Sequence, residues 1–264
     1  MRFGVSSSCF YPMELSFAIE QLVKNGVNCI EIFVNTESEL KSDFIKKIKG
    51  IIQPYNVTVT SVHPFTSGYE HIMLFSDYKR RFEDAVEFYK QYYNFASEFG
   101  ARLVVLHGDR RMPEAGGIPD EEYFERYYRL ATVGREMGVD LGQENVNMFR
   151  SQNPVFIKKM KDCLGSNVSF VFDIKQAVRS GNSPFDVCNA MGDRIIHLHI
   201  NDNNQEQDCL LPGKGTMDYK KLLTQMKSNG FSGNAVIEVY NKNYEKIDDI
   251  IESYKCLNNN FGNL

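Results

Sequence analysis

Six side chains of types that bind metal ions or transfer protons stand at the ends of apolar, strand-like runs: His63, His107, Glu144, Asp173, His199 and Glu238. Burying a lone charge is costly, so an acidic residue that closes an apolar strand needs a partner. A structural role as a hydrogen-bonded core residue explains any one of the six. Six in succession predict a common site, and their types predict that it binds a metal.

Three carboxylates and one imidazole of this group form a ligand set for a hard divalent cation. Glu144, Asp173 and Glu238 offer oxygen, and His199 offers nitrogen. Such a set suits Mn²⁺ or Mg²⁺ better than a histidine-rich zinc centre does, with Co²⁺ and Zn²⁺ as alternatives. With a dication bound, a formal charge of about −1 remains, which favours a neutral polyol as the substrate. We therefore assign His63 and His107 to the substrate.

The elements that position these residues alternate along the chain. Strand-like runs begin near residues 3, 28, 57, 102, 140, 168, 195 and 234, and a helical pattern follows each of them. Strict alternation predicts a parallel sheet, and eight units predict a single (β/α)₈ barrel over residues 1–264. A doubly wound open sheet is the alternative, but no glycine-rich dinucleotide fingerprint follows the first strand. In a barrel all strand ends meet at one mouth, which would bring the six residues together.

Local signals predict the boundaries of several elements. Proline in the first turn predicts helices that start at Asn153-Pro154 and Ser183-Pro184. Wide spacing predicts long loops after the third, fourth and seventh strands. The first four expected strands cover 3–9, 28–34, 57–62 and 102–106, and the last four end at 144, 173, 199 and 238. The expected helices start near 13, 40, 82, 120, 154, 184, 218 and 246.

Composition sets bounds on the class of protein. The chain has 264 residues, 42% hydrophobic and 24% charged, which is typical of a globular protein. A net charge of −4 does not indicate a nucleic-acid-binding surface. There is no apolar leader or long apolar span, and the six cysteines form no CxxC motif, so we expect free thiols, no membrane partner and a cytoplasmic location. Homo-oligomerisation stays open.

Short motifs occur in the same order as the strands: Gly26-Val27-Asn28-Cys29-Ile30-Glu31, Gln143-Glu144-Asn145, Phe172-Asp173, His199-Ile200-Asn201-Asp202, Pro212-Gly213-Lys214-Gly215 and Ile237-Glu238. In this order the chain resembles the xylose-isomerase-like superfamily of TIM barrels. That group includes sugar-phosphate isomerases and epimerases, inosose and dehydroshikimate dehydratases, and endonuclease IV. The resemblance covers essentially the whole chain.

The resemblance implies a metal held by Glu144, Asp173, His199 and Glu238, with the two glutamates as acid and base on opposite faces of a sugar. A metal that chelates a ketone and its neighbouring hydroxyl would acidify the carbon-bound proton and stabilise an enediolate. We therefore expect an isomerase or epimerase of a sugar or sugar phosphate. Dehydration of a cyclitol or polyol ketone is the alternative, and a non-catalytic binding barrel is a third possibility.

The chain departs from this group at two positions. Epimerases and endonuclease IV have a histidine three residues after the strand-six aspartate, where this chain has Gln176. Endonuclease IV also has an Asp-x-His motif in the strand-seven loop, where this chain has Asp208-Cys209-Leu210. Two ligands of a three-zinc cluster are missing, which argues against a nuclease.

Other residues near the predicted mouth have two interpretations each. Arg110 and Arg111 could hold a substrate phosphate or carboxylate, or form surface ion pairs. Lys175 could contact substrate or shuttle a proton, or it could form an ion pair with a metal-ligand carboxylate, and we place it on the side of Asp173 if the strand continues. Gln176 could hydrogen-bond a substrate hydroxyl.

Four further residues have weaker functional interpretations. Lys214 between two glycines is expected to be solvated. His197 lies deeper than His199 and is expected in the core or behind the site. His71 in a loop is a candidate lid residue. Glu31 either lines the mouth or has a hydrogen-bonded packing role.

Overall fold

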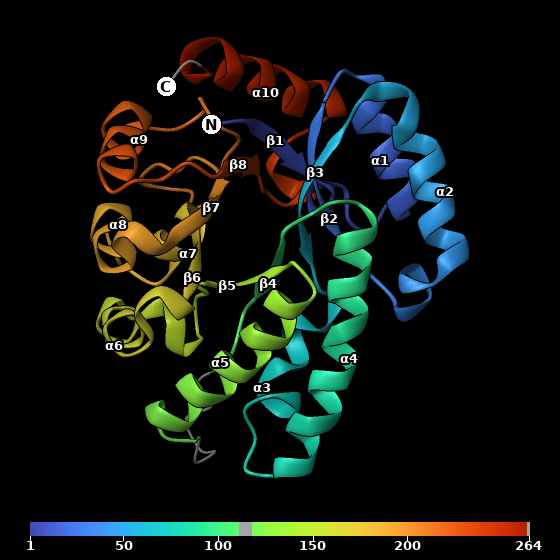
Figure 1. Ribbon diagram of the computed structural model, residues 1–264. Coiled ribbons are helices and arrows are strands. Elements are labelled where there is room, and N and C mark those ends of the chain that lie inside the picture. The colour runs from blue at the N-terminus through green and yellow to red at the C-terminus, as the bar shows by residue number, and fades with distance from the viewer. Residues whose placement is uncertain (111–117, 263–264) are drawn as a thin grey trace.

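The computed structural model describes residues 1–110 and 118–262. Eight parallel strands form a closed barrel in chain order, and β8 pairs with β1 to close it. Figure 1 shows the strands in the middle with the helices around them. The strands are β1 (Phe3–Ser6), β2 (Cys29–Phe33), β3 (Thr58–His63), β4 (Leu103–Leu106), β5 (Asp140–Glu144), β6 (Ser169–Asp173), β7 (Ile195–Ile200) and β8 (Asn234–Ile237). The predicted (β/α)₈ barrel is confirmed, and the open sheet is excluded.

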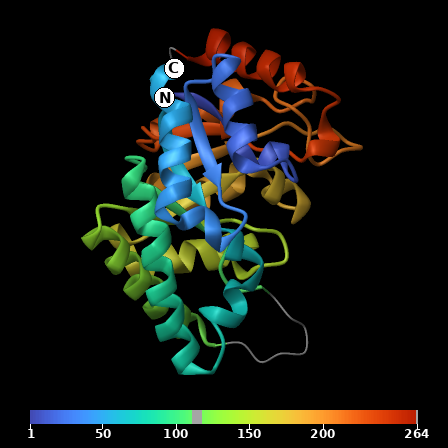
Figure 2. The same cartoon turned by 90° about the vertical axis from the view of Figure 1, so that its right-hand side faces the viewer.

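Helices cover the outside of the barrel, and α10 packs against β1 in both views (Figure 1, Figure 2). Within the described residues no helix is long and apolar enough to cross a membrane. The α-helices are α1 (Leu15–Lys24), α2 (Ser42–Ile52), α3 (Glu70–Met73), α4 (Lys79–Glu98), α5 (Asp120–Glu136), α6 (Pro154–Leu164), α7 (Ile174–Arg179), α8 (Pro184–Met191), α9 (Tyr219–Ser228) and α10 (Ile247–Phe261).

The predicted helix starts at the two proline signals are confirmed. The side chains of Asn153 and Ser183 accept hydrogen bonds from the backbone N–H groups of Val155 and Phe185. Each cap satisfies a donor that the first helical turn leaves unpaired, so the asparagine or serine before proline defines the start of α6 and of α8.

Three elements differ from the expectation, and one of them is the short helix α3, which lies where a loop was expected. The first strand ends at Ser6, and residues Ser7–Phe10 form a 3₁₀ turn in which the Ser6 side chain accepts from the N–H of Ser8. The apolar run misled us because Cys9 and Phe10 are buried without being in a strand. Helix α7 was not anticipated: it begins at Ile174, immediately after β6.

Alternation along the strands divides the core into an outer and an inner part. On β4, Val104 and Leu106 belong to the large cluster between sheet and helices, whereas Leu103 and Val105 form a small cluster with Val171. Successive strand residues face opposite sides, so the small cluster fills the barrel interior. A Cβ at Gly142 would lie 2.7 Å from Val171 Cγ2, so that residue must be glycine for the interior to close.

Candidate metal centre and substrate cavity

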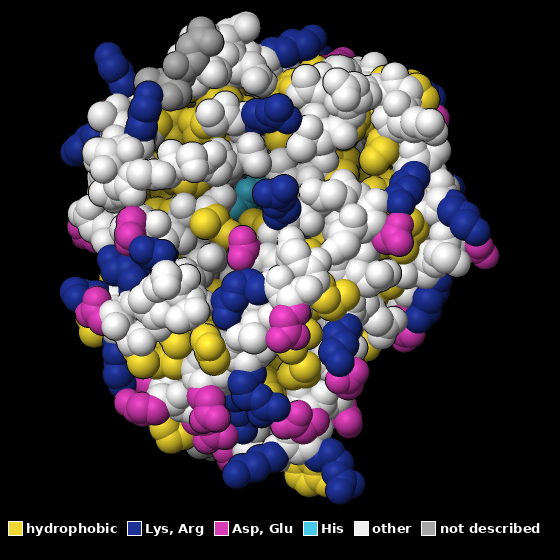
Figure 3. All heavy atoms as spheres, in the orientation of Figure 1, with side chains coloured by type: hydrophobic (Ala, Val, Ile, Leu, Met, Phe, Trp, Pro, Cys, Tyr) yellow, Lys and Arg dark blue, Asp and Glu magenta, His cyan; other side chains and the backbone are white. Residues whose placement is uncertain are grey.

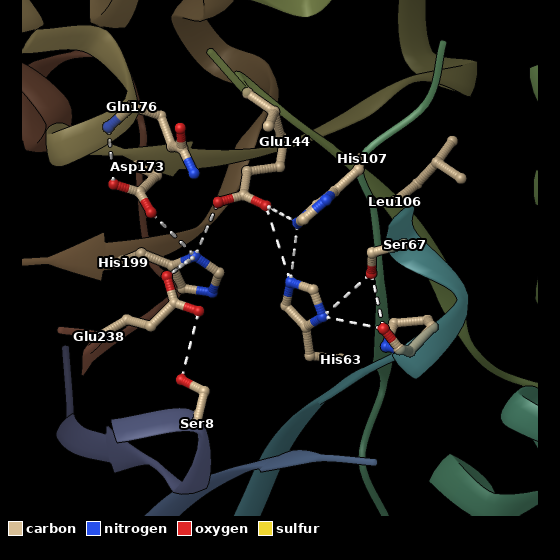
Figure 4. A network of polar contacts seen from close by, with 12 residues as sticks. Ser8, His63, Ser67, Leu106, His107, Glu144, Asp173, Gln176, His199 and Glu238 are labelled. Carbon is tan, nitrogen blue, oxygen red and sulfur yellow. Dashed lines mark hydrogen bonds and ion pairs between the residues drawn. The ribbon is translucent and has the colours of Figure 1, made fainter. Parts of the chain in front are cut away.

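The four predicted metal ligands meet at the carboxyl ends of strands β5 to β8. Glu144 and Asp173 end β5 and β6, His199 lies in β7, and Glu238 directly follows β8. The register places Asp173 opposite His199 on the neighbouring strand. One ligand atom from each residue lies within 4.8 Å of the ligand atoms of the other three. Figure 4 shows the carboxylates of Glu144 and Glu238 approaching the His199 ring from two sides.

The Nδ1 atom of His199 faces the three carboxylates. It lies 3.2 Å from Glu144 Oε1, 3.3 Å from Glu238 Oε2 and 3.6 Å from Asp173 Oδ2. Burial would lower the pKa of His199, but Glu238 and Glu31 raise it well above its ordinary value. Nδ1 is therefore the ring atom that can bind a metal, after it gives up its proton.

Glu31 on β2 fixes the other side of the His199 ring. Its Oε2 lies 3.1 Å from His199 Nε2, accepts a 2.7 Å hydrogen bond from Ser61 Oγ and lies 3.5 Å from His197 Nε2. Burial would raise the pKa of Glu31, but the two imidazoles lower it well below its ordinary range. A carboxylate on the second nitrogen orients a ligating histidine and makes it more basic.

The hydrogen-bonded role expected as the alternative for Glu31 is the one that the structure shows. The side chain of Glu31 is fully buried and does not line the cavity described below. Sequence alternation could have found this role, because Glu31 and the residues it contacts all point into the barrel from their strands. His197 is buried beneath His199, as expected.

Asp173 ends β6 and also caps helix α7. Its Oδ1 accepts from the backbone N–H of Gln176 and from Asn201 Nδ2, both at 3.2 Å. The amide of Asn145 pairs with the backbone of Asp173 on both sides, at 2.8 and 2.9 Å. These contacts hold the carboxylate so that only Oδ2 faces the centre of the site.

Lys175 forms ion pairs with two of the predicted ligands. Its Nζ contacts Asp173 Oδ2 and Glu238 Oε2, and the side chain is almost completely buried. Burial would lower the pKa of Lys175, but the two carboxylates raise it well above its ordinary value, so the amine is charged. The ion pair expected as one alternative for Lys175 is observed, but the strand does not continue to this residue, which reaches Asp173 from the first turn of α7.

His63 and His107 gather on the outer side of Glu144 (Figure 4). His107 Nε2 lies 3.0 Å from Glu144 Oε2 and 3.1 Å from His63 Nε2. Burial would raise the pKa of Glu144, but His107 and its neighbours lower it well below its ordinary value. Burial would lower the pKa of His63, but Glu144 raises it. These three residues form a second group able to bind a cation or a substrate oxygen.

A cavity of about 240 Å³ opens above the site. Three aromatic side chains and several polar ones line it, whereas Asp173 and His199 lie beneath it and are fully buried. The space-filling view shows both signs of charge interspersed over the face of the molecule that it presents (Figure 3). The lining residues are Ser8, Tyr11, Phe33, His63, His107, Glu144, Lys175, Gln176, Glu238, Val239 and Tyr240.

The remaining predicted residues lie at different distances from this cavity. The side chain of Gln176 lines it and accepts a 3.1 Å hydrogen bond from the N–H of Asn147. Arg110 is exposed and is not among the lining residues, and Arg111 lies outside the described residues. Lys214 is exposed, as expected. His71 lies on the short helix α3 and not in a loop.

The residues present fit a hard divalent cation. Three carboxylates and one imidazole converge, and the imidazole is oriented by Glu31. The Asp208 carboxylate, in contrast, is held by Arg179 Nε at 2.7 Å and Nη2 at 3.2 Å. That carboxylate is therefore engaged in an ion pair in this structure.

The family model of the xylose isomerase-like TIM barrel matches residues 19–260. The chain belongs to this family. It is 26% identical to an uncharacterized protein of Methanocaldococcus jannaschii over 97% of this chain and 88% of that protein. It is 23% identical to the fructoselysine 3-epimerase of Escherichia coli O157:H7 over 90% of each chain.

Solved structures give the same result. A D-tagatose 3-epimerase-like protein superposes with a TM-score of 0.78 and 26% sequence identity, covering 98% of this chain and 96% of that chain. The resemblance stated from the short strand motifs is thereby confirmed. The members named here include sugar epimerases.

Proposed function

We propose that this member of the family is a divalent-metal-dependent epimerase or isomerase of a sugar, with Glu144 and Glu238 as the acid–base pair. The metal would be held by these two glutamates together with Asp173 and His199. Mn²⁺ or Mg²⁺ suits this oxygen-rich set best. The epimerases among the relatives support the reaction class.

One observation carries the proposal. Of the four candidate ligands, only the two glutamates line the cavity, and Asp173 and His199 lie beneath it. A substrate in this cavity would therefore meet a carboxylate from β5 and another from the end of β8. Two carboxylates on either side of one carbon are what removal and return of a proton on opposite faces requires.

The ionisation of the two glutamates supports these roles. Burial would raise the pKa of Glu238, but Lys175 and His199 lower it to about 2, so this carboxylate is ionised at neutral pH, the form that a base requires, while contact with the Lys175 ammonium weakens its basicity. Glu144 is ionised as well, and the neighbouring His63, with its raised pKa, lies 3.8 Å from Glu144 Oε2. His63 is thus placed to supply the proton that Glu144 would return to the substrate.

A bound metal would supply Lewis acidity, polarising the substrate carbonyl and its neighbouring hydroxyl. The chain itself would orient the sugar. Tyr11, Phe33 and Tyr240 line the cavity and would pack against the apolar side of a pyranose or an open-chain ketose, and Gln176 and Ser8 would hydrogen-bond to its hydroxyls. His107, partly exposed beside Glu144, is the further substrate contact.

The charges around the cavity favour an unphosphorylated sugar over a sugar phosphate. Among the described residues that line it, Lys175 is the only lysine or arginine, and two carboxylates already pair with its ammonium. Arg179 lies behind Tyr240, donating to its hydroxyl at 2.6 Å, and is paired with Asp208. A phosphate would need a free cation, for which Arg110 is the remaining candidate within the described residues.

Deuterium uptake from D₂O tests the reaction class. The protein, purified with chelator and reloaded with Mn²⁺, is incubated with free and phosphorylated ketoses, and the products are followed by NMR. Exchange at the carbon next to the carbonyl with inversion there indicates an epimerase, and transfer to the neighbouring carbon indicates an isomerase. Loss of water indicates the dehydratase alternative.

Two controls make the result specific. Glu144→Gln and Glu238→Gln should each abolish exchange, while Glu206→Gln, on the exposed part of the strand-seven loop, should not. Ketose binding without exchange in the Mn²⁺-loaded protein would overturn the proposal and favour a binding barrel.

We also propose a cytoplasmic location, in keeping with six free cysteines.

A further inference from the structure

In two carboxylates of the candidate metal centre, those of Asp173 and Glu238, one oxygen is held by other groups of the chain and the second contacts Lys175. Asp173 Oδ1 is occupied by the N–H of Gln176, and Glu238 Oε1 accepts from Ser8 Oγ at 3.4 Å. Asp173 Oδ2 and Glu238 Oε2 remain for a metal. The ammonium of Lys175 contacts both Asp173 Oδ2 and Glu238 Oε2, and these two oxygens also face His199 Nδ1.

We infer that Lys175 is a tethered competitor of the metal: its ammonium holds the metal's oxygens in the metal-free protein and must leave them when a divalent cation binds. This inference rests on the metal site of the proposed function, and it adds that Lys175 sets how tightly that site binds a metal. It concerns a residue that the four-ligand description does not contain.

The competitor is strong because its position is fixed. Lys175 stands in the first turn of α7, whose N-terminus is capped by the same Asp173 that it contacts. Its side chain has almost no exposure to solvent, so few other conformations place the ammonium on a partner. A buried ammonium that left both carboxylates without a new partner would be unfavourable.

A second location for the ammonium exists beside the site. Lys175 Nζ already lies 5.8 Å from the centre of the Tyr240 ring, and both residues line the cavity. Cations are attracted to the face of a tyrosine ring. A metal that took the two oxygens would therefore move the ammonium toward Tyr240 and into the cavity, where it would be next to a bound sugar.

Competition weakens metal binding without preventing it. The three carboxylates of the centre outnumber the single ammonium, so attraction for a dication persists while Lys175 is in place. The apparent dissociation constant rises in inverse proportion to the fraction of molecules in which the oxygens are free. If that fraction is about 1–10%, removing the ammonium should tighten binding about 10- to 100-fold.

Mn²⁺ titration of Lys175→Met tests the inference. We expect this variant to bind Mn²⁺ about 10- to 100-fold more tightly than the wild-type protein, by calorimetry or by the free-Mn²⁺ signal in electron paramagnetic resonance. Lys159→Met is the matched control, since it removes a lysine that pairs with Asp120 and Glu121 on the surface, and it should leave the affinity unchanged.

The wild-type protein provides a second measurement, in case the variant does not fold. Reductive methylation followed by peptide mass analysis should label Lys175 slowly in the presence of chelator and several-fold faster with saturating Mn²⁺, while labelling of Lys159 stays constant. Equal labelling of Lys175 with and without bound Mn²⁺ would overturn the inference.

The outcomes separate this inference from the proposed function. Equal Mn²⁺ affinity of the folded Lys175→Met variant and the wild type overturns the inference and leaves the metal-dependent enzyme intact. Binding to the variant alone supports the inference and overturns a metal-dependent activity of the wild type. Binding to neither protein overturns both.

Discussion

Replacing Glu31 by glutamine tests how the site prepares His199 for a metal. The change keeps the size of a buried side chain and removes its charge. In the wild-type protein Glu31 Oε2 lies 3.1 Å from His199 Nε2 and accepts a 2.7 Å hydrogen bond from Ser61 Oγ, while Oε1 has no hydrogen-bond partner. An amide oxygen at the position of Oε2 could keep both contacts, so the fold should survive.

The expected effect is a loss of metal affinity. A hydrogen bond to a charged acceptor contributes about 1.5–3 kcal/mol and a neutral one about 0.5–1.5 kcal/mol. The substitution should therefore weaken the hydrogen bond that orients the imidazole by about 1–2 kcal/mol. Outer partners of metal ligands typically change metal affinity about 10- to 100-fold. We therefore expect Glu31→Gln to weaken Mn²⁺ binding about 10-fold or more.

Mn²⁺ titration by electron paramagnetic resonance measures this effect, with Ser61→Ala as the matched control. That variant removes one donor to Glu31 but keeps the charge that faces His199, so it should weaken Mn²⁺ binding less than Glu31→Gln does. Wild-type affinity in Glu31→Gln would refute the orienting role. Equal losses in both variants would mean that packing, and not the charge, is responsible.

Three further predictions concern the cavity, a buried acid and the thiols. Gln176→Ala should cost ~1–3 kcal/mol of transition-state binding, whereas Glu238→Gln should slow turnover ~10²–10⁴-fold, and the reverse order of kcat/KM would exclude the two-glutamate mechanism. Burial raises the pKa of Glu70 above 4.5, so the free energy of unfolding of the wild type relative to Glu70→Gln should fall as pH rises from 4.5 through the higher pKa of the folded state, and urea unfolding at several pH values checks this. Ellman's reagent should modify the exposed Cys163 and Cys256 in the native protein. The other four thiols should react slowly, because burial raises their pKa to between about 11 and about 12. Fast reaction of a third thiol would contradict this prediction.

The barrel was predictable because its strands are buried on both faces. Parallel strands of this kind read as continuous apolar runs that end in polar residues, and β3 to β7 lie within a residue or so of the expected ranges. The end of β1 was not predictable, because Cys9 and Phe10 are buried in a turn that continues the apolar pattern. Hydrophobicity reports burial and not backbone conformation.

The convergence of the four ligand types was also predictable, since position at a strand end implies position at the mouth. The contacts of Lys175 with Asp173 and Glu238 were foreseen only as one of two alternatives. The sequence does not show that α7 begins directly after Asp173, and this start decides where the ammonium lies. Glu31 was ambiguous for a similar reason: its partners come from β3 and β7, far away in the chain.

The direct passage from β6 into α7 has a consequence for how this protein could diversify. Asp173 is both the last residue of the strand and the cap of the helix, so no loop exists there that could lengthen or shorten. One inserted residue would turn Lys175 and Gln176 about 100° around the helix axis, away from the mouth. New specificities in descendants of this chain would therefore arise more readily in segments whose length can change, such as those after β1 and β8, which supply Ser8, Tyr11 and Tyr240 to the cavity, while the β6–α7 junction stays constant in length.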